Sequence, residues 1–168
     1  MPDSVTGRRR RWIVLGIGNP DRGDDAAGRA VVRLLRGAPP DGVEIVEQDG
    51  EATALLAQLD GAAAAFVVDA CASGAPAGAV QRFDVGRGPL PRAAFGLSTH
   101  GFGLAEAIEL ARALGQLPQK CVVYAIEGGR FEAGAPLSPP VAAAVVALAE
   151  QLRAEIGADA RPGEEQHA

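Results

Sequence analysis

Residues 12–35 read WIVLGIGNPDRGDDAAGRAVVRLL, and this stretch decides the fold class. Its first part, Trp12–Gly18, is a short apolar run that ends in glycines, which is typical of a strand buried in a parallel sheet. After Asp24 and Asp25, apolar residues recur at three- and four-residue spacing, which predicts a helix to about Leu35. A buried strand followed directly by a helix is the repeating unit of α/β proteins.

The alternation of strands and helices continues along the chain. Further strands are expected at Val43–Val46, Ala64–Asp69, Val80–Val85 and Lys120–Ile126, and further helices at Ala52–Leu59, Gly101–Leu114 and Pro139–Ile156. Val80–Val85 alternates in polarity, so we expect it at an edge of the sheet. Ser138 is expected to cap the last helix, with Pro139 at its first position. The sequence therefore predicts an α/β fold, with a mostly parallel twisted sheet between layers of helices.

The chain is expected to form one domain with a tail at each end. Its 168 residues can bury a real core, and no internal repeat or linker divides them. We assign residues 1–11 to a disordered basic tail, residues 12–156 to the α/β domain, and residues 157–168 to a second disordered tail.

Charge and hydropathy exclude several classes of protein. The net charge is -5 although residues 8–11 are all arginine, so the domain itself is acidic and unlike a nucleic-acid-binding surface. No apolar run reaches the roughly 18 residues of a membrane helix, so no membrane insertion is expected. Cys71 and Cys121 form no metal-binding pair motif, and we expect two buried thiols in a reducing cytoplasm.

Polar residues gather where the predicted strands end, and ligands of open α/β sheets bind at that edge. The candidates are Asn19, Asp21, Asp24, Asp25, Asp69, His100 and Glu127. Asp69 follows a buried strand, where a carboxylate must be paired, hydrogen-bonded or metal-bound; otherwise it caps the next turn. His100 precedes a predicted helix, and it is either a ligand for a transition metal or an exposed or structural histidine.

Asp24 and Asp25 allow two interpretations. Both can lie in the first turn of a helix, where the helix dipole favours acidic side chains. Because adjacent side chains point in different directions, one can instead face the crevice at the sheet edge. Two carboxylates and one imidazole there would suit nickel, zinc or iron, and the metal could polarise a peptide carbonyl or activate water. The carboxylates could also act as a general acid and base.

Several segments resemble the motifs of the hydrogenase maturation proteases. The matching segments are LGIGN at 15–19 with GDDAAG at 23–28, FVVDA at 66–70, STHGFGL at 98–104, and EGG at 127–129 with GAPLS at 134–138. Their order and spacing agree with the family over about residues 12–156. The resemblance implies a twisted sheet between helices.

The resemblance also implies an activity and a site. Members of this family are cytoplasmic endopeptidases that remove a C-terminal extension from the precursor of a nickel–iron hydrogenase large subunit after nickel insertion. The resemblance therefore implies that this chain is an aspartyl-type endopeptidase of this kind. The implied metal-binding and catalytic residues are Asp25, Asp69 and His100. The first position is often Glu in relatives, which leaves Asp24 as an alternative to Asp25. Nickel is expected to come with the precursor, so that a monomeric protease needs no permanent cofactor.

Two other functions are considered. LGIGNP at 15–20 also resembles the GLGNP segment of peptidyl-tRNA hydrolases, but that family calls for a histidine soon afterwards, and residues 21–36 contain none. A non-catalytic nucleotide- or metal-binding scaffold would keep the same fold. A dinucleotide is disfavoured because Asp21 stands at the third glycine position of the fingerprint.

Overall fold

A computed structural model describes residues 11–91 and 103–159. The strands are β1 (Trp12–Ile17), β2 (Val43–Gln48), β3 (Ala64–Cys71), β4 (Val80–Asp84) and β5 (Lys120–Glu127). The helices are α1 (Ala27–Gly37), α2 (Ala52–Leu59), α3 (Leu104–Ala113) and α4 (Pro139–Asp159), and a short 3-10 helix, η1 (Gly23–Ala26), precedes α1.

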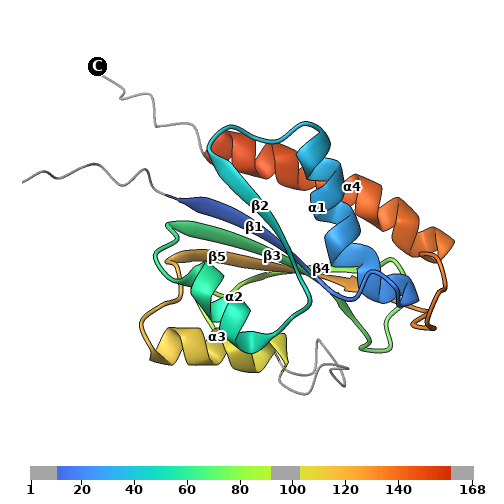
Figure 1. Cartoon of the computed structure of the whole chain (residues 1–168), viewed down its shortest axis with the longest axis horizontal. Coiled ribbons are helices and arrows are strands. Elements are labelled where there is room, and N and C mark those ends of the chain that lie inside the picture. Colours follow the sequence, from blue (N-terminus) through green and yellow to red (C-terminus); the bar gives the residue numbers. More distant parts are fainter. Residues whose placement is uncertain (1–10, 92–102, 160–168) are drawn as a thin grey trace, which may run out of the picture.

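The strands form one twisted sheet in the order β2-β1-β3-β5-β4 (Figure 1). β1, β2, β3 and β5 pair in parallel, and β4 pairs antiparallel with β5 at the edge. The mostly parallel α/β sheet and the edge position of Val80–Val85 are thereby confirmed.

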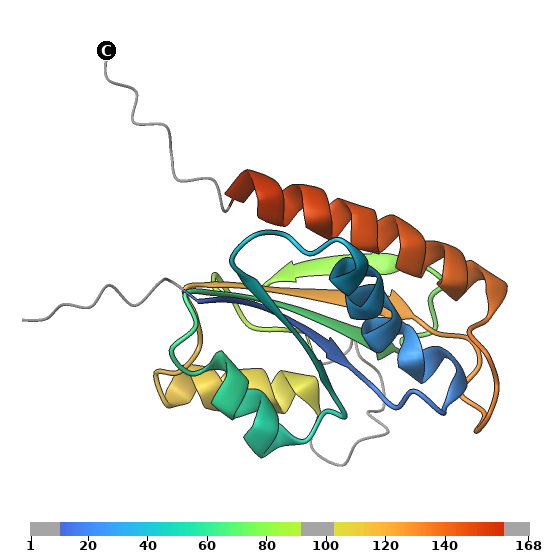
Figure 2. The ribbon, with the colours of Figure 1, turned by 45° about the horizontal axis from the view of Figure 1, so that its top comes forward.

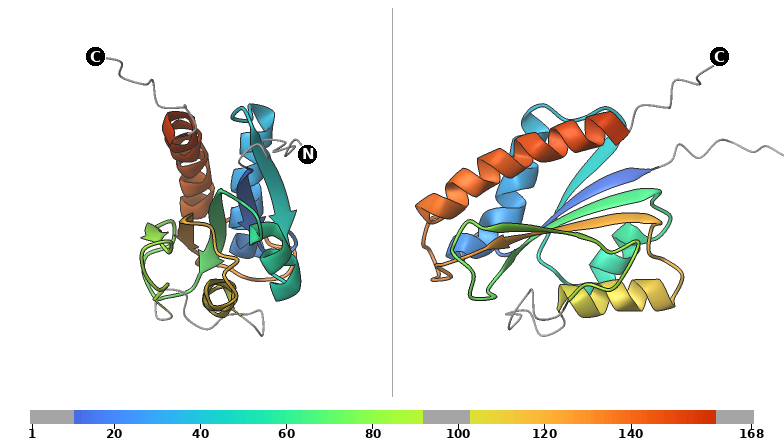
Figure 3. Two further views of the ribbon diagram at one scale, coloured as in Figure 1. Left: turned by 90° about the vertical axis from the view of Figure 1, so that its left-hand side faces the viewer. Right: turned by 180° about the vertical axis from the view of Figure 1, so that it is seen from behind.

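Helices cover both faces of the sheet. α1 and α4 lie on one face and α2 and α3 on the other (Figure 2), and Figure 3 shows β2 and β4 at opposite edges. Phe66 and Tyr124 belong to the core beneath α1 and α4, whereas Ile13 and Ile108 belong to the core beneath α2 and α3. Burial on both faces explains why the central strands are continuous apolar runs.

Helix α1 approaches the sheet very closely because small residues line the contact. A Cβ atom on Gly28 would lie 2.3 Å from the Val68 carbonyl oxygen, and one on Gly16 would lie 2.4 Å from the Gly28 carbonyl oxygen. Any side chain at either position would push the helix away from β1 and β3. This contact holds η1, with its two acids, against the carboxyl ends of the strands.

Some boundaries differ from the sequence-based expectation. The α-helix begins at Ala27 rather than directly after Asp25, because η1 intervenes. α4 continues through residues 157–159, which were expected in the tail. Arg11 was also expected in a tail, yet its guanidinium donates to Glu44 at 2.9 Å and to Gln58 at 2.6 Å.

Two further expectations concern the cysteines and membrane helices. Cys71 and Cys121 are both buried free thiols, as predicted. Within residues 11–91 and 103–159, no helix combines the length and apolar character that crossing a membrane requires.

Candidate active site

The strand order creates a switch point at the carboxyl ends of β1 and β3. From β1 the chain first crosses to β2 on one side, and β3 then pairs with β1 on the other side. Crossovers that leave in opposite directions open a crevice outside the strand ends, where ligands of this fold class bind. Asp25 follows β1 and Asp69 lies near the end of β3, so both predicted acids border this crevice.

Asp69 is a buried acid with little compensation. The residue is only 7% exposed, and its Oδ1 accepts a hydrogen bond from the Ala70 N–H at 2.8 Å. Burial, and next the negative charge of Asp25, raise the pKa of Asp69 to about 8, although the Ala70 hydrogen bond opposes the shift. A cation beside Asp69 would favour the ionised carboxylate and relieve this conflict.

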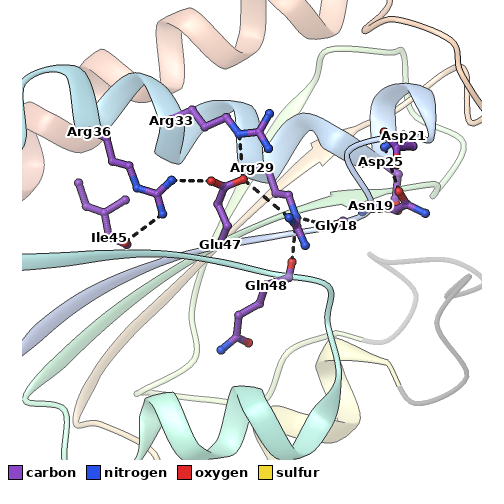
Figure 4. A network of polar contacts seen from close by, with 10 residues as sticks. All are labelled: Gly18, Asn19, Asp21, Asp25, Arg29, Arg33, Arg36, Ile45, Glu47 and Gln48. Carbon is purple, nitrogen blue, oxygen red and sulfur yellow. Dashed lines mark hydrogen bonds and ion pairs between the residues drawn. The ribbon is translucent and has the colours of Figure 1, made fainter.

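Asp25 is held by the loop that precedes it. The residue is 4% exposed, and its Oδ2 accepts from the Asn19 N–H at 2.9 Å (Figure 4). Gly18 makes this loop possible: its φ is +144°, and a Cβ atom there would lie 1.9 Å from the Asp25 carbonyl oxygen. Gly18 therefore serves close packing around Asp25, whereas Gly16 serves the contact with α1.

Asp24 has a different environment from its neighbour. It is fully buried, and its carboxylate accepts from the N–H groups of Gly129, Arg130 and Ser138 and from the Ser138 hydroxyl, at 2.7–2.9 Å. Burial alone would raise the pKa of Asp24, but these hydrogen bonds hold it below the usual value. Asp24 thus joins η1 to the segment before α4. The Ser138 hydroxyl, expected at a helix cap, donates to this acid.

Glu127 fixes the loop that follows Asp69. This buried acid ends β5 and accepts from Cys71 Sγ at 3.1 Å, from the Ser73 N–H and hydroxyl at 2.8 and 2.7 Å, and from the Gly74 N–H at 3.0 Å. Burial alone would raise the pKa of Glu127, but these hydrogen bonds together lower it. The carboxylate predicted at this edge therefore holds neighbouring backbone in place.

Asn19 and Asp21 shape the first loop. Asn19 Oδ1 accepts from the Asp21 N–H at 2.9 Å, which closes a turn of the type that asparagine favours. The Asp21 carbonyl oxygen accepts from the Gly134 N–H at 2.7 Å, while the Asp21 residue itself is exposed. These two candidates therefore organise the β1–η1 connection.

Arg29 and Gln48 also belong to this edge, and neither was predicted. Arg29 Nε donates to the Gly18 carbonyl oxygen at 2.6 Å, and the Gln48 carbonyl oxygen accepts from the Gly18 N–H at 3.0 Å. Arg29, with Arg33 and Arg36 along one side of α1, surrounds Glu47 on β2 (Figure 4). The spacing of the three arginines places them on one helix face, and this signal could have indicated the network.

His100 lies outside the described residues, so its predicted role as a ligand stays a prediction. Across residues 11–91 and 103–159, no group of three or more His, Cys, Asp or Glu side chains is arranged to hold a metal ion. Of the three predicted ligands, the structure describes two acids whose charges interact across the crevice. Two oxygen donors provide part of a cation site and need further ligands from elsewhere.

Comparisons with known proteins agree on one family. A sequence model of the hydrogenase maturation proteases matches residues 29–155, a range that includes Asp69 and His100 and begins after Asp25. The structure is similar to the hydrogenase maturating endopeptidase HybD from E. coli, with 26% identity, coverage of 89% of this chain and 93% of that chain, and a TM-score of 0.75.

Two further solved structures show the same likeness. An endopeptidase from Escherichia coli has 25% identity, covers 89% of this chain and 93% of its own, and gives a TM-score of 0.78. The [NiFe] hydrogenase maturation protease HycI from Thermococcus kodakarensis has 25% identity, with 92% and 96% coverage and a TM-score of 0.67. No curated protein sequence matches the chain significantly.

Proposed function

Because the chain belongs to the hydrogenase maturation protease family, we propose that it removes the C-terminal extension of a nickel–iron hydrogenase large-subunit precursor after nickel insertion. Family membership makes the chain a peptidase, which excludes both the non-catalytic scaffold and the peptidyl-tRNA hydrolase. The proposed enzyme acts as a cytoplasmic monomer, and the precursor is its protein partner.

The observation that carries this proposal is the buried pair of acids at the switch point. Asp25 and Asp69 are 4% and 7% exposed, and their like charges oppose each other. Such a pair is unfavourable unless a cation or a shared proton compensates for it. A nickel ion carried by the precursor would supply that compensation when the substrate docks.

We assign nickel recognition to Asp25, Asp69 and His100. The two carboxylates and one imidazole are a donor set that suits nickel, and the ion belongs to the substrate rather than to a resident cofactor. When bound, nickel can polarise a peptide carbonyl or help to ionise water. The protein residues orient the precursor around its own metal, so that cleavage follows only after nickel has been inserted.

Asp25 is preferred over Asp24 for this role because of their hydrogen bonds. Asp24 already accepts four hydrogen bonds from residues 129–138, and a metal ligand would have to give up some of them. Asp25 interacts electrostatically with Asp69, and Asp24 is absent from the groups that shift the Asp69 pKa.

The first test compares nickel-loaded and nickel-free precursor. The purified protease is expected to cleave the nickel-loaded precursor and to leave the nickel-free precursor intact, because the free acids lack the ion that they recognise. Gel mobility and intact mass of the precursor measure the cleavage. Equal cleavage of both forms would contradict nickel recognition, and cleavage of neither would contradict the proposed activity.

The second test removes two of the proposed ligands. Asp25→Ala and His100→Ala are each expected to lower the rate of precursor cleavage at least about 100-fold, because each removes a metal contact. Circular dichroism should show that both variants remain folded. Asp21→Ala is the matched control, since it removes an exposed acid from the same loop. Retained processing by His100→Ala would reject the proposed ligand set.

A further inference from the structure

Gln48 has an unusual buried side chain at the end of β2. The residue is 8% exposed, and its Oε1 is the one buried side-chain nitrogen or oxygen within residues 11–91 and 103–159 that has no hydrogen-bond partner. A buried carbonyl oxygen without a donor costs stability, commonly about 1–3 kcal/mol. Such a group calls for a physical explanation, and a binding partner supplied by a ligand is one.

The orientation of the Gln48 amide is fixed by its neighbour. Nε2 donates to the Ala54 carbonyl oxygen in α2 at 3.2 Å, and Figure 4 shows the side chain extending from β2 toward α2. Exchanging the nitrogen and oxygen would place two acceptors against each other, so the amide cannot flip to satisfy Oε1. The orphan atom is therefore an acceptor, and its missing partner must be a donor.

Strand register places Gln48 in the same row as Asp69. Gln48 on β2 pairs with Ile17 on β1. The preceding residue of β1, Gly16, pairs with Val68 on β3, so Ile17 is also level with Asp69. Residues in register on adjacent strands point to the same face, which here is the face covered by α2 and α3. Gln48 and Asp69 are thus two strands apart, or about 10 Å, at the carboxyl edge of the sheet.

We propose that Gln48 binds the substrate: its Oε1 accepts a hydrogen bond from a backbone N–H of the precursor's C-terminal extension. An extended peptide advances about 3.4 Å per residue, so a chain cleaved beside Asp69 reaches Gln48 about three residues from the scissile bond. A peptide presents an N–H at almost every residue, whatever its sequence. This inference rests on the proposed function and adds a contact that fixes the register of the extension.

The test separates binding from catalysis and from folding. Gln48→Met keeps the length of the side chain and removes the orphan acceptor. We expect KM for the nickel-loaded precursor to rise about tenfold with kcat within about twofold, because one hydrogen bond to the substrate is lost. The thermal midpoint should not fall, since the variant also removes an unsatisfied buried group. Gln119→Met, which replaces an exposed glutamine directly before β5, is the matched control and should leave both constants unchanged.

An unchanged KM in Gln48→Met would overturn the inference. If the thermal midpoint falls while KM stays unchanged, Gln48 serves only the fold. If Gln48→Met does not fold, Gln48→Leu is measured in its place with the same criteria. Wild-type protein that fails to cleave nickel-loaded precursor defeats the proposed function, whereas wild-type cleavage with unchanged KM in the variant defeats this inference alone.

Discussion

The Asp69→Asn variant is expected to lose precursor cleavage and, at neutral pH, to be more stable than the wild-type protein. Asparagine keeps the size of the side chain and the acceptor for the Ala70 N–H, but it removes the buried charge that opposes Asp25. Cleavage should fall at least about 100-fold because one of the proposed nickel ligands is lost. The free energy of unfolding at pH 7 should rise by roughly 2–4 kcal/mol, because the folded wild-type protein must either bury this charge or hold a proton.

The sign of the pH dependence follows from the Asp69 pKa. The folded protein has a pKa of about 8 at this residue, whereas the ordinary value is 3.8. Between these values the folded state binds more protons at Asp69 than the unfolded state does, so stability falls as pH rises. Above the folded pKa, the contribution of Asp69 to this slope ends. The stability difference between Asp69→Asn and wild type should therefore widen from about pH 4 to about pH 8.

Urea unfolding at several pH values, without metal, measures this difference. Subtracting the wild-type stability from that of the variant cancels most of the other titrating groups. Asp41→Asn is the matched control, because it makes the same chemical change at an exposed loop position. A lower stability for Asp69→Asn at pH 7, or a difference that does not change with pH, would show that the Asp69 carboxyl is not strained by burial.

The fold was predictable because its signals are local. β1 and β5 are continuous apolar runs, and α1 shows its buried residues at helical spacing, so each segment indicates its own structure. The boundaries were less predictable. Asp24 and Asp25 favour a first helical turn, yet the hydrogen bonds of Asp24 to residues 129–138 hold this turn as η1. Partners more than 100 positions away leave no signal in a local pattern.

The site was predictable only in part. Acids that follow the first and third predicted strands could be placed together, because parallel strands bring their carboxyl ends to one edge of the sheet. The residue pattern left the choice between Asp24 and Asp25 open, and the family resemblance favoured Asp25. Only the structure shows that Asp24 accepts the backbone N–H groups of the distant segment. Gln48 gave no signal at all, because a lone glutamine at the end of a strand is ordinary and only the structure reveals its unpaired oxygen.

The three acids have different roles. We assign Asp25 and Asp69 to nickel recognition, whereas Asp24 stabilises the fold. Burial and the negative charge of Asp25 raise the pKa of Asp69, so an ionised Asp69 carboxylate is unfavourable in the free protein. Asp24 is instead an anchor: the hydrogen bonds that its carboxylate accepts join η1 to the segment before α4. Strain at a site is commonly balanced by stabilising contacts nearby. Of the two adjacent acids, Asp24 is thus the one whose hydrogen bonds anchor η1.

Asp24→Ala is expected to lower the free energy of unfolding by about 3–5 kcal/mol, a large fraction of the stability of a small domain. The change removes the acceptor for the Gly129, Arg130 and Ser138 N–H groups and for the Ser138 hydroxyl, and it leaves the two Ser138 donors without a partner in the interior. Unsatisfied buried donors cost more than the lost hydrogen bonds themselves would contribute. Urea unfolding at pH 7 measures the effect.

Two variants separate the anchor from a catalytic role. Ser138→Ala removes the hydroxyl donor alone and should lower the free energy of unfolding by about 1 kcal/mol. Asp24→Asn retains one acceptor oxygen but turns an amide group toward an N–H donor. Its decrease in the free energy of unfolding should therefore fall between the decreases for Ser138→Ala and Asp24→Ala. Because Asp24 holds η1 and is not proposed to touch nickel, the folded fraction of Asp24→Asn should still cleave nickel-loaded precursor. A stable Asp24→Asn protein without activity would contradict this and would make Asp24, rather than Asp25, the acid that meets the metal.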